Sequence, residues 1–259
     1  MAPEPVFKGV GVALVTLFGQ DGQLDAPATA ELAGRLAQLG VKAVLVAGTT
    51  GEAAALEMGE RSEILAAVRK VLPDSGEVAL LAGTGAPWGG QAARLTAAAV
   101  DAGADAVLAL SPLGAVDPRP YYDKVARAAG GVPVLAYHLP TVSPPGVAVD
   151  VLADLPVAGL KDSSGDAGRL LATVEGWDRP VYVGSSALVA MAGSIGCAGA
   201  ILALANAEPE KCAAAFAGSA RAQLELAKPR VAEANFPGGV KGLVAARFGY
   251  SPVARLGTS

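Results

Sequence analysis

The chain has 259 residues, of which 52% are hydrophobic and 17% are charged. The charged fraction lies below the average for soluble domains, roughly a quarter, so much of the chain must be buried. Its net charge of -4 gives no basic surface for phosphate backbones, which excludes nucleic acid as an expected partner. This length suits a single α/β barrel domain.

The two cysteines and the N-terminus favour a cytoplasmic protein. Cys197 and Cys212 lie close together in a chain that has no other cysteine, so they do not suggest a disulfide framework. The first ten residues, MAPEPVFKGV, lack the charged and then apolar pattern of a secretory signal. We therefore expect a reducing compartment and no membrane association.

The predicted elements alternate between short apolar runs and amphipathic segments. The runs in chain order are GVGVALVTLF, VKAVLVAG, EVALLAG, ADAVLALS, VPVLAYH, VAGLK, PVYVGS and AGAILAL. Each is almost continuously hydrophobic, which is typical of strands buried on both faces of a parallel sheet. Asp25 and Pro27 predict the start of a helix that ends at Gly40, and Asp117 and Pro118 predict another through Arg127.

Eight such units predict an α/β fold, a (β/α)8 TIM barrel over residues 1–219. Residues 220–259 read as a short C-terminal helical extension: a helix, a break at NFPGG and the helix VKGLVAARFG. A doubly wound open sheet is the alternative, but it needs a switch point that the sequence does not indicate.

One uncharged stretch, residues 187–207, is long enough to suggest a membrane span. Gly193, Gly196 and Gly199 interrupt it, and Ser194 and Asn206 add polarity. A helix, a turn and a buried strand explain this stretch better.

Chemistry in such barrels sits at the carboxyl ends of the strands. The second run ends in Gly48, Thr49 and Thr50, whose backbone and hydroxyl groups can bind an anion or a carbonyl, although an ordinary polar turn is equally possible. Tyr137 ends the fifth run and can relay protons if it faces the barrel mouth; otherwise it is a core aromatic residue. Strand alternation turns His138 the other way, so we interpret this single histidine as structural, which leaves His-based metal sites little support.

Lys161 ends the sixth run. An isolated lysine at a strand end is usually a solvated charge, but one that faces the barrel axis is desolvated and can attack a carbonyl as a free amine. Gly184 and Ser185 end the seventh run before a predicted helix N-terminus, where a substrate carboxylate or phosphate could bind. Ile201 lies in the small-residue strand GAI, which leaves room near the backbone.

Three ordered motifs, GTTGE, YxxP at Tyr137 and GLKDSSGD, resemble those of the dihydrodipicolinate synthase and N-acetylneuraminate lyase family of class I aldolases. The resemblance implies a (β/α)8 barrel, usually a homodimer or homotetramer, that needs no metal or organic cofactor. It also implies that Lys161 forms a Schiff base with pyruvate or another 2-oxo acid and that Tyr137 shuttles protons. Thr49 and Thr50 would contact the substrate carboxylate and support the tyrosine.

Two departures bear on the substrate. Ser111, Pro112, Leu113 and Gly114 stand where dihydrodipicolinate synthases carry a tyrosine pair, and Val142 replaces their arginine at the mouth of the site. Valine cannot pair with a carboxylate as arginine does. Tyr121 and Tyr122 are assigned to the next helix.

Further departures from the family pattern bear on regulation and assembly. Ala53, Pro87 and Gln91 do not match the lysine feedback site of some family members, so lysine inhibition is not expected. The tail after Arg255 and Leu256 is shorter than usual in the family, which puts the higher assembly in question.

The sequence therefore predicts a carbon–carbon, or carbon–oxygen, lyase or aldolase that acts on pyruvate or a related 2-oxo acid and an aldehyde. A 2-keto-3-deoxy sugar acid is a candidate substrate. The nearest alternative is synthesis of 4-hydroxy-tetrahydrodipicolinate from pyruvate and aspartate semialdehyde. An alternative of another class is a ligand-binding paralogue without catalytic activity.

Overall fold

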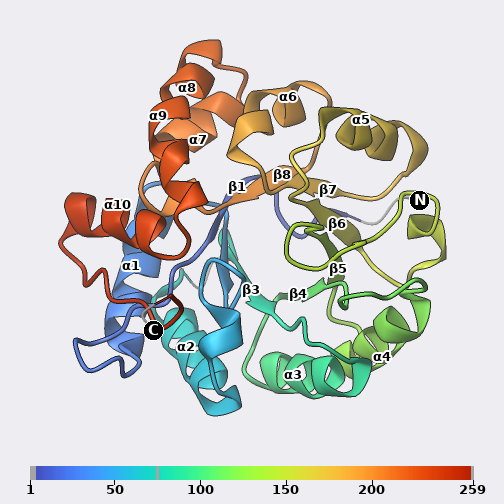
Figure 1. Ribbon diagram of the computed structural model, residues 1–259, viewed down its shortest axis with the longest axis horizontal. Helices are drawn as coiled ribbons and strands as arrows, with labels where there is room; N and C mark the ends of the chain where they lie inside the picture. Colours follow the sequence, from blue (N-terminus) through green and yellow to red (C-terminus); the bar gives the residue numbers. More distant parts are fainter. Residues whose placement is uncertain (1–3, 74–75, 258–259) are drawn as a thin grey trace.

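The computed structural model describes residues 4–73 and 76–257. In these residues, parallel strands pair in chain order and close into a barrel, with β1 hydrogen-bonded to β8 (Figure 1). The strands are β1 (Gly9–Ala13), β2 (Ala43–Val46), β3 (Ala79–Gly83), β4 (Ala106–Leu110), β5 (Val134–His138), β6 (Gly159–Asp162), β7 (Val181–Val183) and β8 (Gly199–Leu202). The predicted (β/α)8 barrel is confirmed.

The helices surround this barrel (Figure 1). They are α1 (Ala26–Gln38), α2 (Met58–Val71), α3 (Gly89–Asp101), α4 (Arg119–Ala129), α5 (Ala167–Gly176), α6 (Val189–Ser194) and α7 (Pro209–Phe216). The side chain of Asp25 caps α1 by accepting a hydrogen bond of 2.9 Å from the backbone N–H of Ala28, as the sequence predicts. Tyr121 and Tyr122 lie in α4, which confirms their assignment to that helix.

One connection differs from a regular βα unit. Between β5 and β6, a segment that the structure describes throughout, the only helical turn is the 3-10 turn η2 (Leu152–Asp154). Pro140, Pro144 and Pro145 lack backbone donors, and Gly146 adopts a positive φ of 79°. These residues prevent a helix from starting early in the segment, so too few residues remain for a full one.

The barrel interior is packed with small and aliphatic side chains. Its members are Phe7, Ala13, Ala43, Leu45, Ala79, Leu81, Ala106, Leu108, Leu135, Tyr137, Tyr182 and Ile201. Phe7 stacks on Tyr182 at 4.7 Å between ring centroids, and the Tyr182 hydroxyl donates a hydrogen bond of 3.1 Å to the Phe7 carbonyl. Because Phe7 precedes β1, this pair closes the amino end of the barrel and leaves the carboxyl end for a site.

Asn206 fastens the closing seam between β1 and β8. It lies in the buried 3-10 turn η4 (Leu204–Asn206) that follows β8. Its Oδ1 accepts a hydrogen bond of 3.0 Å from the Val15 N–H, and its Nδ2 donates one of 2.6 Å to the Ala13 carbonyl. Asn206, a polar residue of the uncharged stretch, therefore stabilises the closure of the barrel.

The stretch 187–207 folds as 3-10 turn η3 (Ser186–Leu188), helix α6, a turn and strand β8, as predicted from its glycines. In the described residues, no helix is both long and apolar enough to cross a membrane. Cys197 and Cys212 are both free and buried.

The C-terminal extension consists of α8 (Ala220–Glu225), α9 (Ala227–Arg230), the 3-10 turn η5 (Val231–Ala234) and α10 (Gly238–Phe248). Helix α8 packs beside α7, and the chain then returns past α10 toward α2 (Figure 1). The extension is therefore packed against the barrel at both its start and its end.

Candidate active site

Lys161 lies inside the barrel, near its carboxyl end. Its side chain is 4% exposed, and its Cα is in register with Tyr137 of β5 and Tyr182 of β7. The Nζ atom lies 4.4 Å from the centroid of the Tyr137 ring. Both side chains belong to the inward set of their strands, so the lysine is not a solvated charge at a strand end.

Gly184 gives this lysine its space. A Cβ built at Gly184 would overlap Oγ of Ser163 and lie 2.9 Å from Cε of Lys161. Any side chain here would therefore push against the lysine or against the residue that follows its strand. The absence of a side chain at the end of β7 is a steric requirement of the site.

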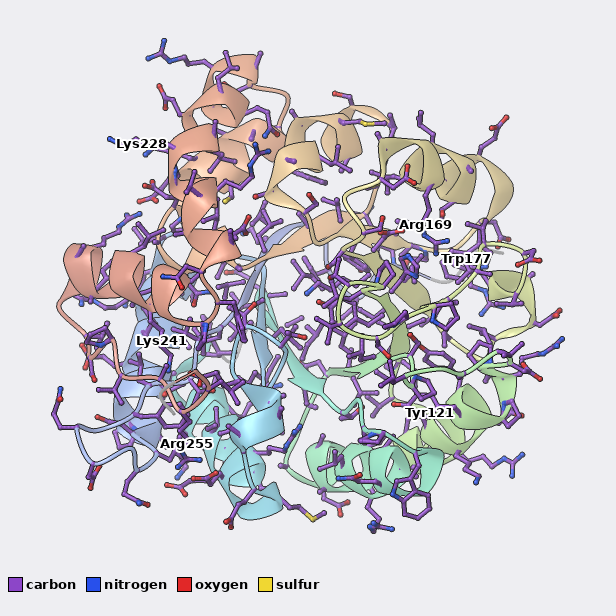
Figure 2. The ribbon with its side chains drawn as sticks, in the orientation of Figure 1. Tyr121, Arg169, Trp177, Lys228, Lys241 and Arg255 are labelled. Carbon is purple, nitrogen blue, oxygen red and sulfur yellow. The ribbon has the colours of Figure 1, made fainter. Side chains whose placement is uncertain are left out.

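The residues that flank Lys161 hold the loop after β6. Asp162 faces away from the barrel axis and forms an ion pair of 2.8 Å with Arg169. It also accepts hydrogen bonds from the Ser164 N–H at 2.8 Å and hydroxyl at 2.6 Å. Arg169 lies on this side of the barrel, away from Lys241 and Arg255 (Figure 2).

His138 belongs to the same outer layer. Its Nδ1 accepts a hydrogen bond of 2.9 Å from the Val147 N–H, and its Cα is in register with Asp162. The pKa of His138 is lowered, chiefly by burial and also by the nearby charge of Arg169. The carboxylate of Asp162 opposes this shift without reversing it. The alternation predicted for strand five is confirmed, and this histidine holds the β5–β6 loop.

The GTTGE loop follows β2 at the same end of the barrel. Gly48 is buried, while Thr49 and Thr50 are half-buried. The Thr16 hydroxyl donates a hydrogen bond of 2.7 Å to the Gly51 carbonyl, which ties the loop to the segment after β1. In the described residues, no hydrogen bond joins either threonine to the Tyr137 hydroxyl, and the support of the tyrosine by this pair stays a prediction.

The backbone of this loop is strained at both ends. Ala47 has a φ of +51° and Glu52 a φ of +56°, a region that residues with side chains rarely adopt. Gly83 of β3 must be glycine, because a Cβ there would overlap the Ala47 carbonyl. Such strain persists only where surrounding contacts enforce it, and it often marks functional sites.

Glu52 supplies those contacts, a role that the sequence motif did not reveal. This carboxylate is fully buried and lies 2.5 Å from Nζ of Lys241. It also accepts hydrogen bonds of 2.8 Å from the backbone N–H groups of Arg255 and Leu256. The C-terminal extension therefore fixes the GTTGE loop, although the two are about 200 residues apart in the chain.

The remaining predicted residues line the β7 and β8 ends. Ile201 is buried in the interior cluster with Tyr137, and Ser185 is half-buried after Gly184. Ser186 is buried, and its hydroxyl donates a hydrogen bond of 2.5 Å to Glu233, a second acidic residue that the sequence did not single out. The helix predicted after these serines begins as a 3-10 turn, and α6 itself has only six residues.

The loops after β4 and β5 carry the two departures from the family pattern. The Gly114 N–H donates a hydrogen bond of 2.7 Å to the Pro144 carbonyl, so the loops lie side by side. Leu113 is 69% exposed and Val142 is 52% exposed. In the described part of the chain, no group of three or more His, Cys, Asp or Glu side chains could hold a metal ion.

The closed barrel with a buried lysine on its sixth strand is the arrangement that the sequence motifs predict for a class I aldolase, and comparison with known proteins gives the family. The model of the dihydrodipicolinate synthetase family matches residues 6–233, so the chain belongs to this family. Proteins of the family are lyases and aldolases, and this chain is an enzyme of that class.

Individual relatives agree with this assignment. The chain is 36% identical over 211 residues to an uncharacterized DapA-like lyase of Halobacterium salinarum, covering 78% of this chain and 68% of the relative. It is 33% identical over 239 residues to the 4-hydroxy-tetrahydrodipicolinate synthase of Pseudomonas aeruginosa, covering 84% and 78%.

A solved structure is similar over most of both chains. The dihydrodipicolinate synthase from Acinetobacter baumannii complexed with pyruvate shares 26% sequence identity and a TM-score of 0.81. The similarity covers 97% of this chain and 94% of that one.

Proposed function

We propose that Lys161 forms a Schiff base with pyruvate or a closely related 2-oxo acid and that the enzyme makes or breaks a carbon–carbon bond next to it. The observation that carries this proposal is the burial of the Lys161 amine against the Tyr137 ring, at the open end of the barrel. The pyruvate complex of a structural relative supports the choice of 2-oxo acid.

The reaction proceeds through an imine and an enamine. The amine attacks the C2 carbonyl, water leaves, and the protonated imine withdraws electrons from the adjacent carbon. In the cleavage direction, the C4 hydroxyl of a 2-keto-3-deoxy sugar acid gives up its proton through Tyr137, the C3–C4 bond breaks, its electron pair forms the enamine, and an aldehyde departs. Protonation of the enamine and hydrolysis of the imine then release pyruvate and the free lysine.

Each neighbouring residue has a role in this proposal. Tyr137 carries protons between substrate and water, because its ring adjoins the amine. Gly48, Thr49 and Thr50 bind the substrate carboxylate, and the half-buried threonines leave their hydroxyls accessible. Gly184, Ser185 and Ile201 line the β7 and β8 side. No metal or organic cofactor enters these steps.

Synthesis of 4-hydroxy-tetrahydrodipicolinate is a second candidate, favoured by the names of several relatives. Its aldehyde, aspartate semialdehyde, carries a carboxylate. Val142 offers no positive charge to that carboxylate, and Leu113 and Gly114 offer no tyrosine hydroxyl. These residues favour an aldehyde partner without a carboxylate. Retention of Lys161, Tyr137 and the threonine pair argues against an inactive, ligand-binding paralogue.

We also propose that the protein is a homodimer or a homotetramer. Leu113, Val116 and Val142 are exposed apolar residues on the adjoining loops after β4 and β5. Clusters of exposed apolar side chains of this kind are typical of surfaces that associate.

A coupled assay tests the proposed reaction. Pyruvate released from 2-keto-3-deoxy sugar acids is measured with lactate dehydrogenase and NADH, and condensation of pyruvate with aspartate semialdehyde is measured in parallel. We expect cleavage of a sugar acid to have the higher kcat/KM. Tyr137→Phe should lower kcat by on the order of 100-fold while borohydride still traps pyruvate on Lys161. Normal turnover in this variant would refute its proton-transfer role.

A further inference from the structure

Glu233 reaches the carboxyl ends of β7 and β8 from outside the barrel. It lies in the 3-10 turn η5 of the C-terminal extension. Its Oε2 accepts a hydrogen bond of 2.5 Å from the hydroxyl of Ser186, which follows β7. The backbone of Leu204, which follows β8, is close enough to lower the pKa of the carboxyl group. One carboxylate therefore lies beside two adjacent strand ends at the open end of the barrel and forms a bridge between them.

This bridge lies at the mouth that contains Lys161. A Cβ built at Gly184 would lie 2.9 Å from Cε of Lys161, and Ser186 is only two residues further along the chain. In its protonated form, Lys161 is close enough to Glu233 to lower the pKa of that carboxyl group, a smaller effect than the burial that raises it. The two groups therefore share one electrostatic environment.

Glu233 forms no ion pair with any residue that the structure describes, although the charge of Arg230 also acts on it. Glu233 is half-buried, and a carboxylate that loses part of its hydration without a paired cation is costly to maintain. Burial is the main reason that the pKa of Glu233 is raised. Structural carboxylates elsewhere in this protein, at Glu52, Glu60 and Asp162, each have a cation within 2.8 Å.

A carboxylate at this point selects among aldehydes by hydrogen bonding and by charge. It accepts hydrogen bonds from hydroxyl groups, and it repels a carboxylate or a phosphate. The loop after β5, two strands away from β7, supplies no compensating cation at Val142. Both features point to an uncharged, hydroxylated aldehyde half.

We propose that Glu233 is a specificity-determining residue of the C-terminal extension. With Ser186, it binds hydroxyl groups in the aldehyde half of a polyhydroxylated 2-oxo acid, and it disfavours aldehyde halves that carry phosphate or carboxylate. This inference rests on the proposed Schiff-base function and adds the substrate class and the residue that selects it.

The test compares two substrates that share the same pyruvate half: a six-carbon 2-keto-3-deoxy sugar acid and its 6-phosphate. In the wild-type protein, the unphosphorylated acid should have the higher kcat/KM. Glu233→Gln keeps the size of the side chain and removes its charge, so it should lower the ratio of the two kcat/KM values by roughly tenfold or more. Pyruvate trapping on Lys161 by borohydride should be unchanged, because Glu233 does not contact that half.

Two further variants separate selection from stability. Glu225→Gln lies on exposed α8 of the same extension and should leave the ratio unchanged. Ser186→Ala should lower kcat/KM for the unphosphorylated acid without affecting trapping. This variant tests the same hydroxyl-binding subsite if Glu233→Gln folds poorly.

The outcomes distinguish the two proposals. An unchanged ratio in Glu233→Gln, with trapping intact, overturns the assignment of Glu233 and leaves the Schiff-base function standing. Trapping of pyruvate by a wild-type protein that cleaves neither sugar acid also overturns the assignment of Glu233 and leaves the Schiff-base function standing. Failure of the wild-type protein to trap any 2-oxo acid overturns the function itself and the specificity proposal with it.

Discussion

The reactivity of the Lys161 amine depends on the residues that surround it. An exposed lysine is protonated and poorly nucleophilic near neutral pH, whereas a desolvated amine is a nucleophile. Here the barrel fold turns the side chain inward, between Tyr137 and Tyr182, and Gly184 leaves it room. The reactivity that we propose therefore depends on neighbours from the two strands that flank β6, namely β5 and β7, and on the residue that follows β7.

Gly184→Ala tests this steric requirement. The added methyl group would crowd Ser163 and Cε of Lys161, so we expect pyruvate trapping on the lysine to fall by at least tenfold. Gly59→Ala in α2 is the matched control, since a Cβ there meets nothing within 4 Å and alanine suits a helix. Equal trapping in the Gly184 variant and the control would show that the lysine tolerates the added group.

Residue-level predictions from the sequence succeeded where a local rule applied. Alternation along a strand placed Tyr137 inside the barrel and His138 outside it. Glu52 and Glu233 escaped notice because their partners, Lys241 and Ser186, are far away in the chain. A carboxylate that becomes important through a distant contact leaves no periodic pattern in the sequence.

At the scale of elements, the C-terminal extension and the GTTGE loop form one unit. An ion pair joins Glu52 to Lys241, and hydrogen bonds join these two side chains to the backbone of Val253 and Arg255. Lys241 and Arg255 lie on the same side of the molecule (Figure 2). The extension thereby holds the strained loop that carries Thr49 and Thr50.

Lys241→Met tests the central contact of this unit. Burial lowers the pKa of Lys241 below its ordinary value. Glu52 opposes this effect, because its carboxylate stabilises the charged form of the lysine. Removing one member of a buried pair leaves an uncompensated charge, and we expect a loss of about 3–5 kcal/mol in the free energy of unfolding. Urea unfolding measures this loss. The exposed control Lys228→Met should change stability by less than about 0.5 kcal/mol, and equal effects would contradict the assignment.

The ion pair between Glu60 and Arg255 predicts a pH dependence. Their closest atoms are 2.6 Å apart, and Arg255 lowers the pKa of Glu60 below its ordinary value of 4.5. A lowered carboxyl pKa in the folded state contributes stability above the unfolded pKa, and this contribution is lost as pH falls through the folded pKa. The stability advantage of wild type over Glu60→Gln should therefore shrink as pH falls below about 4.5. A difference that is constant from pH 7 to pH 3 would contradict this.

At the scale of the whole molecule, the sequence predicted the barrel because eight apolar runs separated by helical segments have few alternative arrangements. The missing helix between β5 and β6 was harder to predict. Pro144, Pro145 and Gly146 exclude a helix only because the segment that remains before β6 is short, and that length is known only once the strand bounds are known. Contacts between the extension and the strand ends required the three-dimensional structure.

The exposed apolar loops predict self-association. Sedimentation velocity should show a dimer or a tetramer at micromolar concentration, and Val116→Asp should shift it toward smaller species, because a charge in an apolar interface is poorly solvated. The exposed substitution Leu224→Asp on α8 is a control at a distant surface. A wild-type protein that sediments as a monomer would refute the proposed assembly.

The central claim is that Lys161 forms an imine with a 2-oxo acid. The most direct measurement is incubation with pyruvate, reduction with borohydride and peptide mass spectrometry. We predict a reduced pyruvyl adduct on the peptide that contains Lys161, and its loss in Lys161→Ala but not in Lys228→Ala. Absence of an adduct with pyruvate and with other small 2-oxo acids, in a protein that remains folded, would contradict the account.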